Sequence, residues 1–293
     1  MGLSSGSHGA VHFSVPLIVG DVGDPKLLHQ IFQKYTIDAV MHFASFIQVG
    51  ESINQPAKYF ENNLSKTLTL LGCMARHQIK NFIFSSTAAI FGNPMTSRIN
   101  EFHPTTPINP YGRSKLLVEQ VLFDYEAAYH IRHVCLRYFN AAGAQPDGSL
   151  GECHEPETHL IPLAINAALG RGPSLKIYGN DYPTADGTCI RDYVHVCDIA
   201  AAHLLALGHL RNQGQSLKLN LGNGEGYSVK DVLESVGRVT GKPVPYEFVA
   251  RREGDPAVLV ADANNAKTIL NWTPRFPALD DIITHAHGWH SSC

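Results

Sequence analysis

The sequence predicts an α/β protein built on a doubly wound parallel sheet. Apolar runs of strand length alternate with segments whose apolar residues follow helical spacing, from Val15 to Phe139. This alternation is typical of a parallel sheet with helices on both faces. Ligands bind such sheets at the carboxyl ends of the strands. By this pattern the strand-end positions are Asp21, Phe43, Thr87 and Phe139.

The first half of the chain predicts its elements in order. Strands are expected at residues 15–19, 37–42, 81–87 and 134–139, each apolar enough to be buried on both faces of a sheet. Asp24 and Pro25 suit the N-cap and the first turn of a helix. Two further helices are expected at residues 56–78 and 111–129.

The second half of the chain differs from the first in composition and in the lengths of its expected elements. Residues 141–157 are rich in Gly, Pro and acidic residues and predict a loop. Helices are expected at residues 160–169, 198–207 and, capped by Ser228, 228–239. Strands are expected at residues 174–178, 192–195 and 217–221. These elements break the regular alternation of the first half.

The composition excludes several classes of function. The 293-residue chain has a formal net charge of −3, which argues against nonspecific binding to nucleic acid or to a membrane surface. Its apolar runs are shorter than the ~20 residues of a membrane span, and residues 1–12 do not have the pattern of a signal peptide. The six cysteines form no Cys-x-x-Cys pair, which favours mostly buried thiols in a reducing compartment. We therefore expect a cytoplasmic protein.

Three histidines near the carboxyl end, His285, His287 and His290, suggest a metal site at first sight. Two of them can share one face of a helix. A solvated terminal helix explains them more simply, so we expect no metal there.

The strongest chemical signal combines Tyr111, Lys115 and Thr87. Tyr111 and Lys115 are four residues apart, so a helix places them on one face. An ammonium beside a phenol favours the phenolate and lowers the pKa of the tyrosine from its usual value of about 10. Such a tyrosine is a usable general base near neutral pH. Thr87, at a strand end, can hydrogen-bond the same substrate hydroxyl.

These residues resemble the extended short-chain dehydrogenase/reductase superfamily and, within it, the UDP-glucose 4-epimerase family. The resemblance covers nearly the whole chain. Its motifs lie at residues 20–22, 42–45, 49–52, 62–63, 111–115, 137–140, 157–162, 178–184, 191–195 and 251–255. It implies a Rossmann-like first domain, bound NAD and a UDP-sugar substrate.

The resemblance implies a reaction at C4 of the sugar, where UDP-galactose and UDP-glucose differ. Tyr111 would take the proton of the C4 hydroxyl while the C4 hydride moves to NAD, and both steps would reverse after the 4-ketose has turned over. Lys115 would keep Tyr111 ionisable and bind the nicotinamide ribose, and Thr87 would hydrogen-bond the reacting hydroxyl.

The resemblance also assigns binding residues. The cofactor would be held by Thr87, Tyr111 and Lys115 together with Asp21, Val22, Phe43, Ala44, Asn62, Tyr138 and Phe139. The UDP-sugar would be held by Asn140, His159, Leu160, Ile177, Tyr178, Arg191, Arg252 and Asp255. In this set Arg191 and Arg252 would bind the diphosphate, since a planar guanidinium suits phosphate oxygens. Ile177 and Tyr178 would bracket the uracil.

Members of this family begin with a strand and a Gly-x-x-Gly-x-x-Gly turn, and this sequence has neither. We expect a truncated NAD-binding domain at residues 1–140. Residues 141–293 would be mainly a substrate domain, with segments near 194 and 219 returning to the first. Glycine turns let backbone N–H groups reach a pyrophosphate. Residues 1–293 alone are therefore expected to aggregate or stay partly unfolded, to retain no NAD and to show no epimerase activity. An upstream extension is expected to restore folding, bound NAD and activity.

Two alternatives stay open. One is another NAD-dependent nucleotide-sugar epimerase that acts on UDP-pentoses or UDP-N-acetylhexosamines. A second is an inactive remnant that binds nucleotide sugar or nothing. A dehydratase is disfavoured, because Ala88 and Ala89 follow Thr87 where elimination needs an acid pair. By resemblance we also expect a homodimer formed through the helices at Pro56 and Tyr111.

Overall fold

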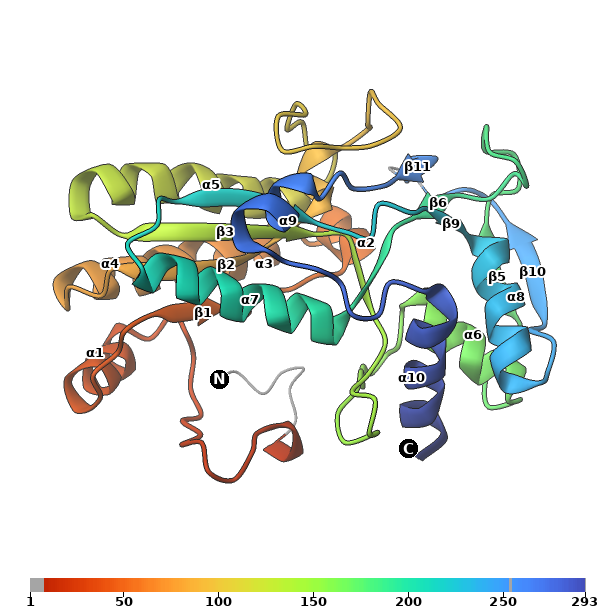
Figure 1. Ribbon diagram of the computed structural model, residues 1–293, viewed down its shortest axis with the longest axis horizontal. Coiled ribbons are helices and arrows are strands. Elements are labelled where there is room, and N and C mark those ends of the chain that lie inside the picture. Colours follow the sequence, from red (N-terminus) through yellow and green to blue (C-terminus); the bar gives the residue numbers. More distant parts are fainter. Residues whose placement is uncertain (1–7, 253–254, 293) are drawn as a thin grey trace. The chain divides into compact units, whose positions relative to one another are not determined.

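The protein is represented by a computed structural model that describes residues 8–252 and 255–292 (Figure 1). It divides into two compact units. The first unit comprises Met1–Asn93, Pro104–Arg137 and His203–Leu219, and the second comprises Pro94–His103, Tyr138–Ala202 and Asn220–Cys293. Residue 219 thus belongs to the first unit and Val194 to the second. Which unit binds which ligand stays a prediction.

The first unit is built around a four-stranded sheet in the order β1-β2-β3-β8. Its strands are β1 (Val40–His42), β2 (Asn81–Thr87), β3 (Arg132–Tyr138) and β8 (Leu217–Leu221). β1 and β2 run parallel, with Val40 opposite Phe82 and His42 opposite Phe84. All seven residues of β2 are buried, as a central parallel strand requires. The α/β class with a parallel central sheet is confirmed.

The first unit contains the helices α1 (Pro25–Lys34), α2 (Val49–Asn54), α3 (Pro56–Tyr59), α4 (Lys66–Arg76) and α5 (Pro110–Tyr129). Of these, α1, α4 and α5 share one apolar core with the sheet. The core joins Leu28 of α1, Leu71 of α4 and Val118 of α5 to Phe82 and Cys135 of the sheet. The predicted cap is confirmed, because the Asp24 side chain accepts from the backbone N–H groups of Lys26 and Leu27.

Two predictions in this unit were wrong in detail. Residues 15–19 form no strand, and the side chains of Val15 and Val19 are 55 % and 54 % exposed. A strand needs a neighbour to accept its backbone hydrogen bonds, and no described strand pairs with this segment. Asp21 therefore does not follow a strand end.

The strand expected at residues 37–42 is shorter, because its partner β2 begins at Asn81. The side chain of Asn81 bonds the backbone oxygen of Asp38, and the ladder starts only at Val40. Val40 and Met41 are half-buried rather than buried, as suits a strand at the edge of the described sheet.

The helix expected at residues 56–78 forms as one continuous run with a wider turn inside it. Between α3 and α4 lies a π-helical segment, η2 (Phe60–Ser65). Such segments are uncommon and often mark functional positions. This one contains Asn62 and the buried Asn63.

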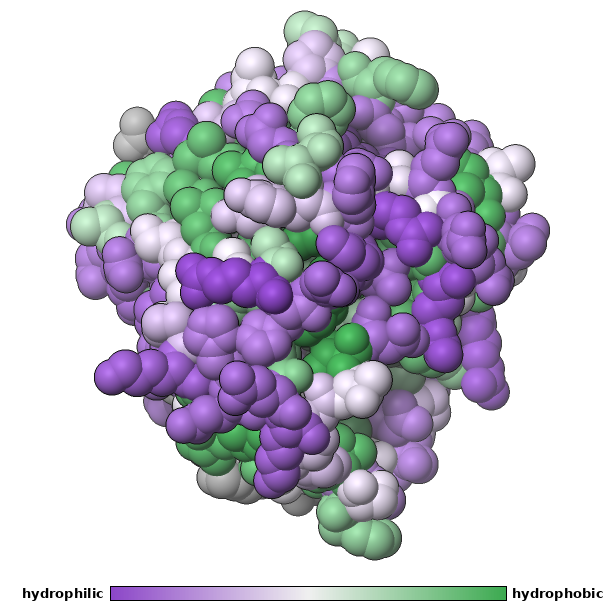
Figure 2. Space-filling model, turned by 90° about the vertical axis from the view of Figure 1, so that its left-hand side faces the viewer, coloured by the Kyte–Doolittle hydropathy of each residue, from purple (hydrophilic) through white to green (hydrophobic). Residues whose placement is uncertain are grey.

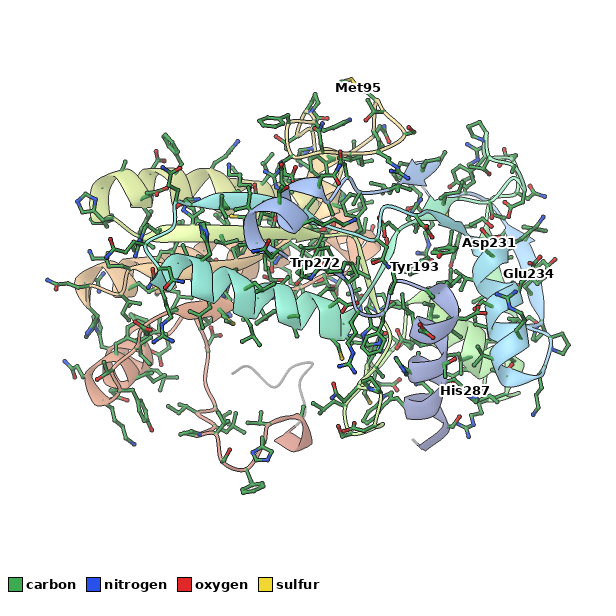
Figure 3. All side chains as sticks on the ribbon, in the orientation of Figure 1. Met95, Tyr193, Asp231, Glu234, Trp272 and His287 are labelled. Carbon is green, nitrogen blue, oxygen red and sulfur yellow. The ribbon has the colours of Figure 1, made fainter. Side chains whose placement is uncertain are left out.

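The second unit has its own core around three helices. These are α6 (Leu160–Ala168), α8 (Val229–Thr240) and α10 (Leu279–Ser292). They pack with β4 (Asn140–Ala142), β5 (Leu175–Tyr178) and β7 (Tyr193–His195). The predicted Ser228 cap is present as a capping box with Asp231, labelled in Figure 3.

Short elements complete the described chain. They are the 3-10 helices η1 (His8–Ala10) and η3 (Ala88–Phe91), the strands β6 (Ile190–Arg191), β9 (Tyr227–Ser228), β10 (Tyr246–Val249) and β11 (Val258–Leu259), and the helices α7 (Val196–Arg211) and α9 (Asn264–Leu270). Instead of one strand at residues 192–195, β6 and β7 flank Asp192. The backbone of Asp192 bonds Leu259 and Asn140, which lie in two different small sheets.

The surface mixes polar and apolar side chains. Figure 2 shows one face, on which hydrophobic residues emerge in patches among hydrophilic ones. Of the five cysteines that the structure describes as free thiols, Cys73 and Cys135 are buried and Cys153 is exposed, so the expectation of mostly buried thiols was wrong. No described helix has the length and apolar character needed to cross a membrane.

Candidate active site

The first turn of α5 positions Tyr111 and Lys115 in the first unit. The Asn109 side chain caps this helix by accepting from the backbone N–H of Gly112 at 2.8 Å, and Pro110 opens it. A side chain at Gly112 would collide with the backbone oxygen of Ala89, so glycine lets the helix approach the end of β2 closely. Tyr111 is 9 % exposed, and its ring meets that of Tyr59 edge-on at 6.5 Å.

Lys115 is a buried cation, with a relative exposure of 1 %. Its ammonium donates to the Ser45 hydroxyl and to the backbone oxygen of Ser85, both at 2.8 Å. It also lies 4.9 Å from the centre of the Phe84 ring. Burial lowers the pKa of Lys115 to about 7, although the carboxylate of Glu119 acts in the opposite direction. Near neutral pH this group can therefore exchange between charged and neutral forms.

Thr87 lies where β2 ends and η3 begins. Its side-chain oxygen accepts from the backbone N–H of Ala89 at 3.1 Å, which caps η3. A hydroxyl that accepts one bond still has its own proton to donate. The structural role of a cap and the predicted role in binding a substrate hydroxyl are therefore compatible.

Residues predicted to hold the cofactor in the first unit differ in how open they are. Phe43 is 56 % exposed and packs on the His203 ring at 4.6 Å, and Ala44 is exposed. Asp21 is bonded to Lys66 at 2.6 Å and to the backbone of Gly23. The Lys66 ammonium lowers the pKa of Asp21.

Val22 and Asn62 have structural partners in the same unit. Val22 packs against the core of the unit. Asn62 is half-buried, and its amide donates to the side chain of Asn63 at 3.1 Å.

Three of the predicted residues surround the end of β3 and belong to the second unit. Tyr138 is half-buried and Phe139 is buried at 9 %. The backbone of Phe139 donates to Leu221, and that of Asn140 donates to Asp192. The side chain of Asn140 is exposed.

The two diphosphate candidates, Arg191 and Arg252, both belong to the second unit. Arg191 is 9 % exposed; its guanidinium donates to Asp255 at 3.1 Å and to the backbone oxygens of Ile190 and Pro256. Arg252 is exposed and lies 3.8 Å from the centre of the Tyr178 ring. The sequence did not indicate that Arg191 pairs with Asp255. This ion pair holds together two residues that are both predicted to bind the UDP-sugar.

The predicted uracil contacts differ in access. Ile177 is 1 % exposed and belongs to the core of the second unit, so almost none of its surface is open to a ligand. Tyr178 is half-buried.

His159 precedes α6 and Leu160 begins it. The His159 imidazole is bonded to the Glu152 carboxylate, which raises the pKa of the histidine. Both residues line a cavity of about 50 Å³ together with Glu152, Asn140 and His290.

Sequence reasoning missed several residues that build the site. Ser45 binds the Lys115 ammonium. The buried Asn63 bonds both backbone groups of Phe46 and the hydroxyl of Ser114, and so ties the segment after β1 to α5. A paired Asn at residues 62–63 was visible in the sequence, but nothing local indicated which of the two faces inward.

Comparison with known proteins identifies the family. A family model described as GDP-mannose 4,6 dehydratase matches residues 3–285. A UDP-glucose 4-epimerase of Halalkalibacterium halodurans is 50 % identical over 288 residues, which cover 98 % of this chain and 86 % of that protein. The chain belongs to the UDP-glucose 4-epimerase family. Its predicted membership is confirmed.

Solved epimerase structures have the same fold. The UDP-glucose 4-epimerase from Brucella ovis in complex with NAD is 48 % identical, with a TM-score of 0.95 over 98 % of this chain and 89 % of that chain. The epimerase from Bifidobacterium longum in complex with NAD+ and UDP is 39 % identical, with a TM-score of 0.90 over 95 % of this chain and 84 % of that chain.

The depressed pKa of Lys115 predicts a specific pH dependence of stability. Its folded pKa of about 7 lies below the usual 10.5, so between these values the unfolded chain binds more protons and folding becomes more favourable as pH rises. Lys115→Met removes this contribution. We expect the free energy of unfolding of the variant, minus that of the parent, to be larger at pH 7 than near pH 10.5.

Urea denaturation of both proteins at the two pH values measures this difference. The exposed Lys26 provides a control, because Lys26→Met should shift stability equally at both. An equal difference for Lys115→Met at the two pH values would contradict the depressed pKa.

Proposed function

We propose that this protein is an NAD-dependent UDP-glucose 4-epimerase, an isomerase that interconverts UDP-galactose and UDP-glucose. The observation that carries the proposal is the buried group of Thr87, Tyr111 and Lys115 in a chain with epimerase relatives along 98 % of its length. The family resemblance assigns these three residues to the reaction at C4 of the sugar.

The residues of the first unit fit the ribose side of a nicotinamide cofactor. An ammonium has three N–H donors, and the acceptors of Lys115 among the described residues are Ser45 and Ser85. A ribose hydroxyl of the cofactor can accept a hydrogen bond from the third N–H group. When bound, NAD supplies the oxidising power by taking up the C4 hydrogen and returning it. Phe43 and Ala44, both exposed after β1, would line the same cofactor.

Tyr111 acts on the proton of the C4 hydroxyl in this proposal. As a general base it accepts that proton during oxidation and returns it during reduction. Lys115 stabilises the phenolate when it carries its charge. Thr87 orients the reacting hydroxyl by donating its free proton, and its bond with Ala89 fixes the position of its oxygen.

The second unit supplies the sugar-nucleotide residues. Arg191 is already oriented by Asp255 and two backbone oxygens, so little side-chain freedom is lost when it binds a diphosphate. Arg252 offers an exposed guanidinium that rests on Tyr178. His159, Asn140 and Leu160 line one cavity and would contact the sugar or its phosphates.

We also propose that the protein acts in the cytoplasm as a homodimer. The family resemblance supports a dimer formed through α3 and α5, and α5 carries Phe123 with an exposure of 70 %. An apolar side chain on an open helix face suits burial against a second copy. Sedimentation equilibrium tests this, and a mass of 32.0 kDa at micromolar concentration would refute the dimer.

A substitution at Tyr111 tests the reaction. Tyr111→Phe removes the proton acceptor and should reduce turnover of UDP-galactose by ~10² or more, with UDP affinity unchanged. Tyr129→Phe, at the far end of the same helix, is the control and should keep parent turnover. Parent-like turnover of Tyr111→Phe in an NAD-loaded protein would remove Tyr111 from the mechanism.

Calorimetry with UDP alone tests diphosphate recognition independently of catalysis. Arg252→Ala and Arg191→Ala should each weaken UDP binding about ten- to hundredfold, because each loses charged hydrogen bonds. The adjacent Arg251 pairs with Asp181 at 2.6 Å, so Arg251→Ala should leave UDP affinity unchanged. Equal affinity in Arg252→Ala and the parent would mean that Arg252 has no part in binding.

A further inference from the structure

The segment before α6 gathers four side chains whose ligand atoms converge. Glu152, His154, Glu157 and His159 each offer one such atom, and these atoms all lie within 4.8 Å of one another. All four belong to the second unit and are partly buried. In the sequence, only the carboxyl-terminal histidines suggested a metal site, and no metal was expected there.

These four residues form the Glu/His cluster, which centres on the Glu152 carboxylate. Nδ1 of His154 lies 2.9 Å from Oε1 of Glu152, and Nδ1 of His159 is bonded to the same oxygen. The second carboxylate belongs to Glu157. Its Oε2 lies 3.9 Å from Nδ1 of His154, and its Oε1 lies 3.7 Å from Nδ1 of His159. Two imidazole nitrogens therefore face two carboxylates across a space that a single ion can bridge after small adjustments.

The surroundings hold the cluster in place. The Trp289 indole donates to the backbone oxygen of Glu152 at 2.7 Å and so anchors the segment to α10. Glu157 accepts from the backbone N–H groups of Thr158 and His159 at 2.7 and 2.8 Å. Because these bonds already order the donors, an ion that binds them has less conformational entropy to overcome.

An adjoining cavity gives room for the rest of a coordination shell. Glu152 and His159 line the cavity of about 50 Å³ that also contacts Asn140 and Leu160. A space of this size accommodates one or a few water molecules. An ion held by the cluster can thus keep a water ligand on the cavity side.

The donor set selects the kind of ion. Two imidazoles and two carboxylates suit Zn²⁺ and its neighbours among the transition metals. Mg²⁺ and Ca²⁺ prefer oxygen ligands only.

We propose that the Glu/His cluster is a binding site for a transition-metal ion, with Zn²⁺ as the best fit. When a metal ion binds, His159 becomes one of its ligands and can no longer contact the sugar nucleotide. This second part rests on the proposed function, in which His159 contacts the substrate. Zn²⁺ would then weaken sugar-nucleotide binding.

Titration of the purified protein with Zn²⁺ alone tests the site. We expect one ion per chain at the cluster and no comparable binding of Mg²⁺. His154→Ala and Glu157→Gln should each weaken Zn²⁺ binding at least about tenfold. Loss of a residue that only hydrogen-bonds a metal ligand already weakens metal binding about tenfold or more, and loss of the ligand itself should cost at least as much. Glu157→Gln keeps an oxygen to accept the backbone bonds, so the segment should stay folded in that variant.

His287 on α10, labelled in Figure 3, provides the matched control. His287→Ala should bind Zn²⁺ like the parent. Parent-like binding in both His154→Ala and Glu157→Gln, or loss of binding in His287→Ala alone, would overturn the site.

The coupling to substrate has its own measurement. At a concentration that saturates the parent but not His154→Ala, Zn²⁺ should weaken UDP-glucose binding to the parent about tenfold and leave that of His154→Ala unaffected. Unchanged UDP-glucose affinity in the Zn²⁺-loaded parent would overturn the coupling. A protein that binds Zn²⁺ at the cluster but converts no UDP-galactose would count against the proposed function and not against the metal site.

Discussion

The burial of the Lys115 ammonium is the constraint on which the first unit's site depends. A cation removed from water is costly unless polar groups replace the lost hydration. Here the replacements come from Ser45 after β1 and from the backbone oxygen of Ser85 in β2, with the Phe84 ring below. Satisfying this one charge fixes α5, the end of β2 and the segment after β1 relative to one another.

A second buried layer supports the first. One turn along α5 from Lys115, Glu119 is fully buried and binds Arg137 through both carboxylate oxygens. Ser86 donates to the same carboxylate at 2.5 Å. The negative charge of Glu119 partly offsets the effect of desolvation on the pKa of Lys115. The buried carboxylate of Glu119 thus helps Lys115 to keep its proton near neutral pH.

The second unit uses a buried carboxylate in a similar way. Asp192 is fully buried and accepts from the backbone N–H groups of Asn223, Gly224 and Ala261. Burial raises its pKa to about 6. Its neighbour Arg191 turns to the other side and pairs with Asp255. This carboxylate therefore holds two distant backbone segments, at residues 223–224 and at Ala261, beside the position of Arg191.

The Glu/His cluster shows how local spacing and tertiary contact combine. All four residues lie within one short segment, so their order was readable in the sequence. Their convergence was not, because a loop without a regular period gives no rule for the direction of its side chains. The Trp289 indole, far along the chain, helps to fix the arrangement by donating to the backbone oxygen of Glu152.

The sequence by itself determined the elements whose signals are local. Periodic apolar residues located α5 and α6, cap residues located the starts of α1 and α8, and the pair Tyr111 and Lys115 followed from helical spacing. Tertiary structure decided everything that needs a distant partner. Residues 15–19 are apolar yet form no strand, because strand formation requires a neighbouring ladder. The partners of Lys115, Arg191 and His159 were likewise hidden, since a charge shows in the sequence but the group that neutralises it depends on which segments meet in space.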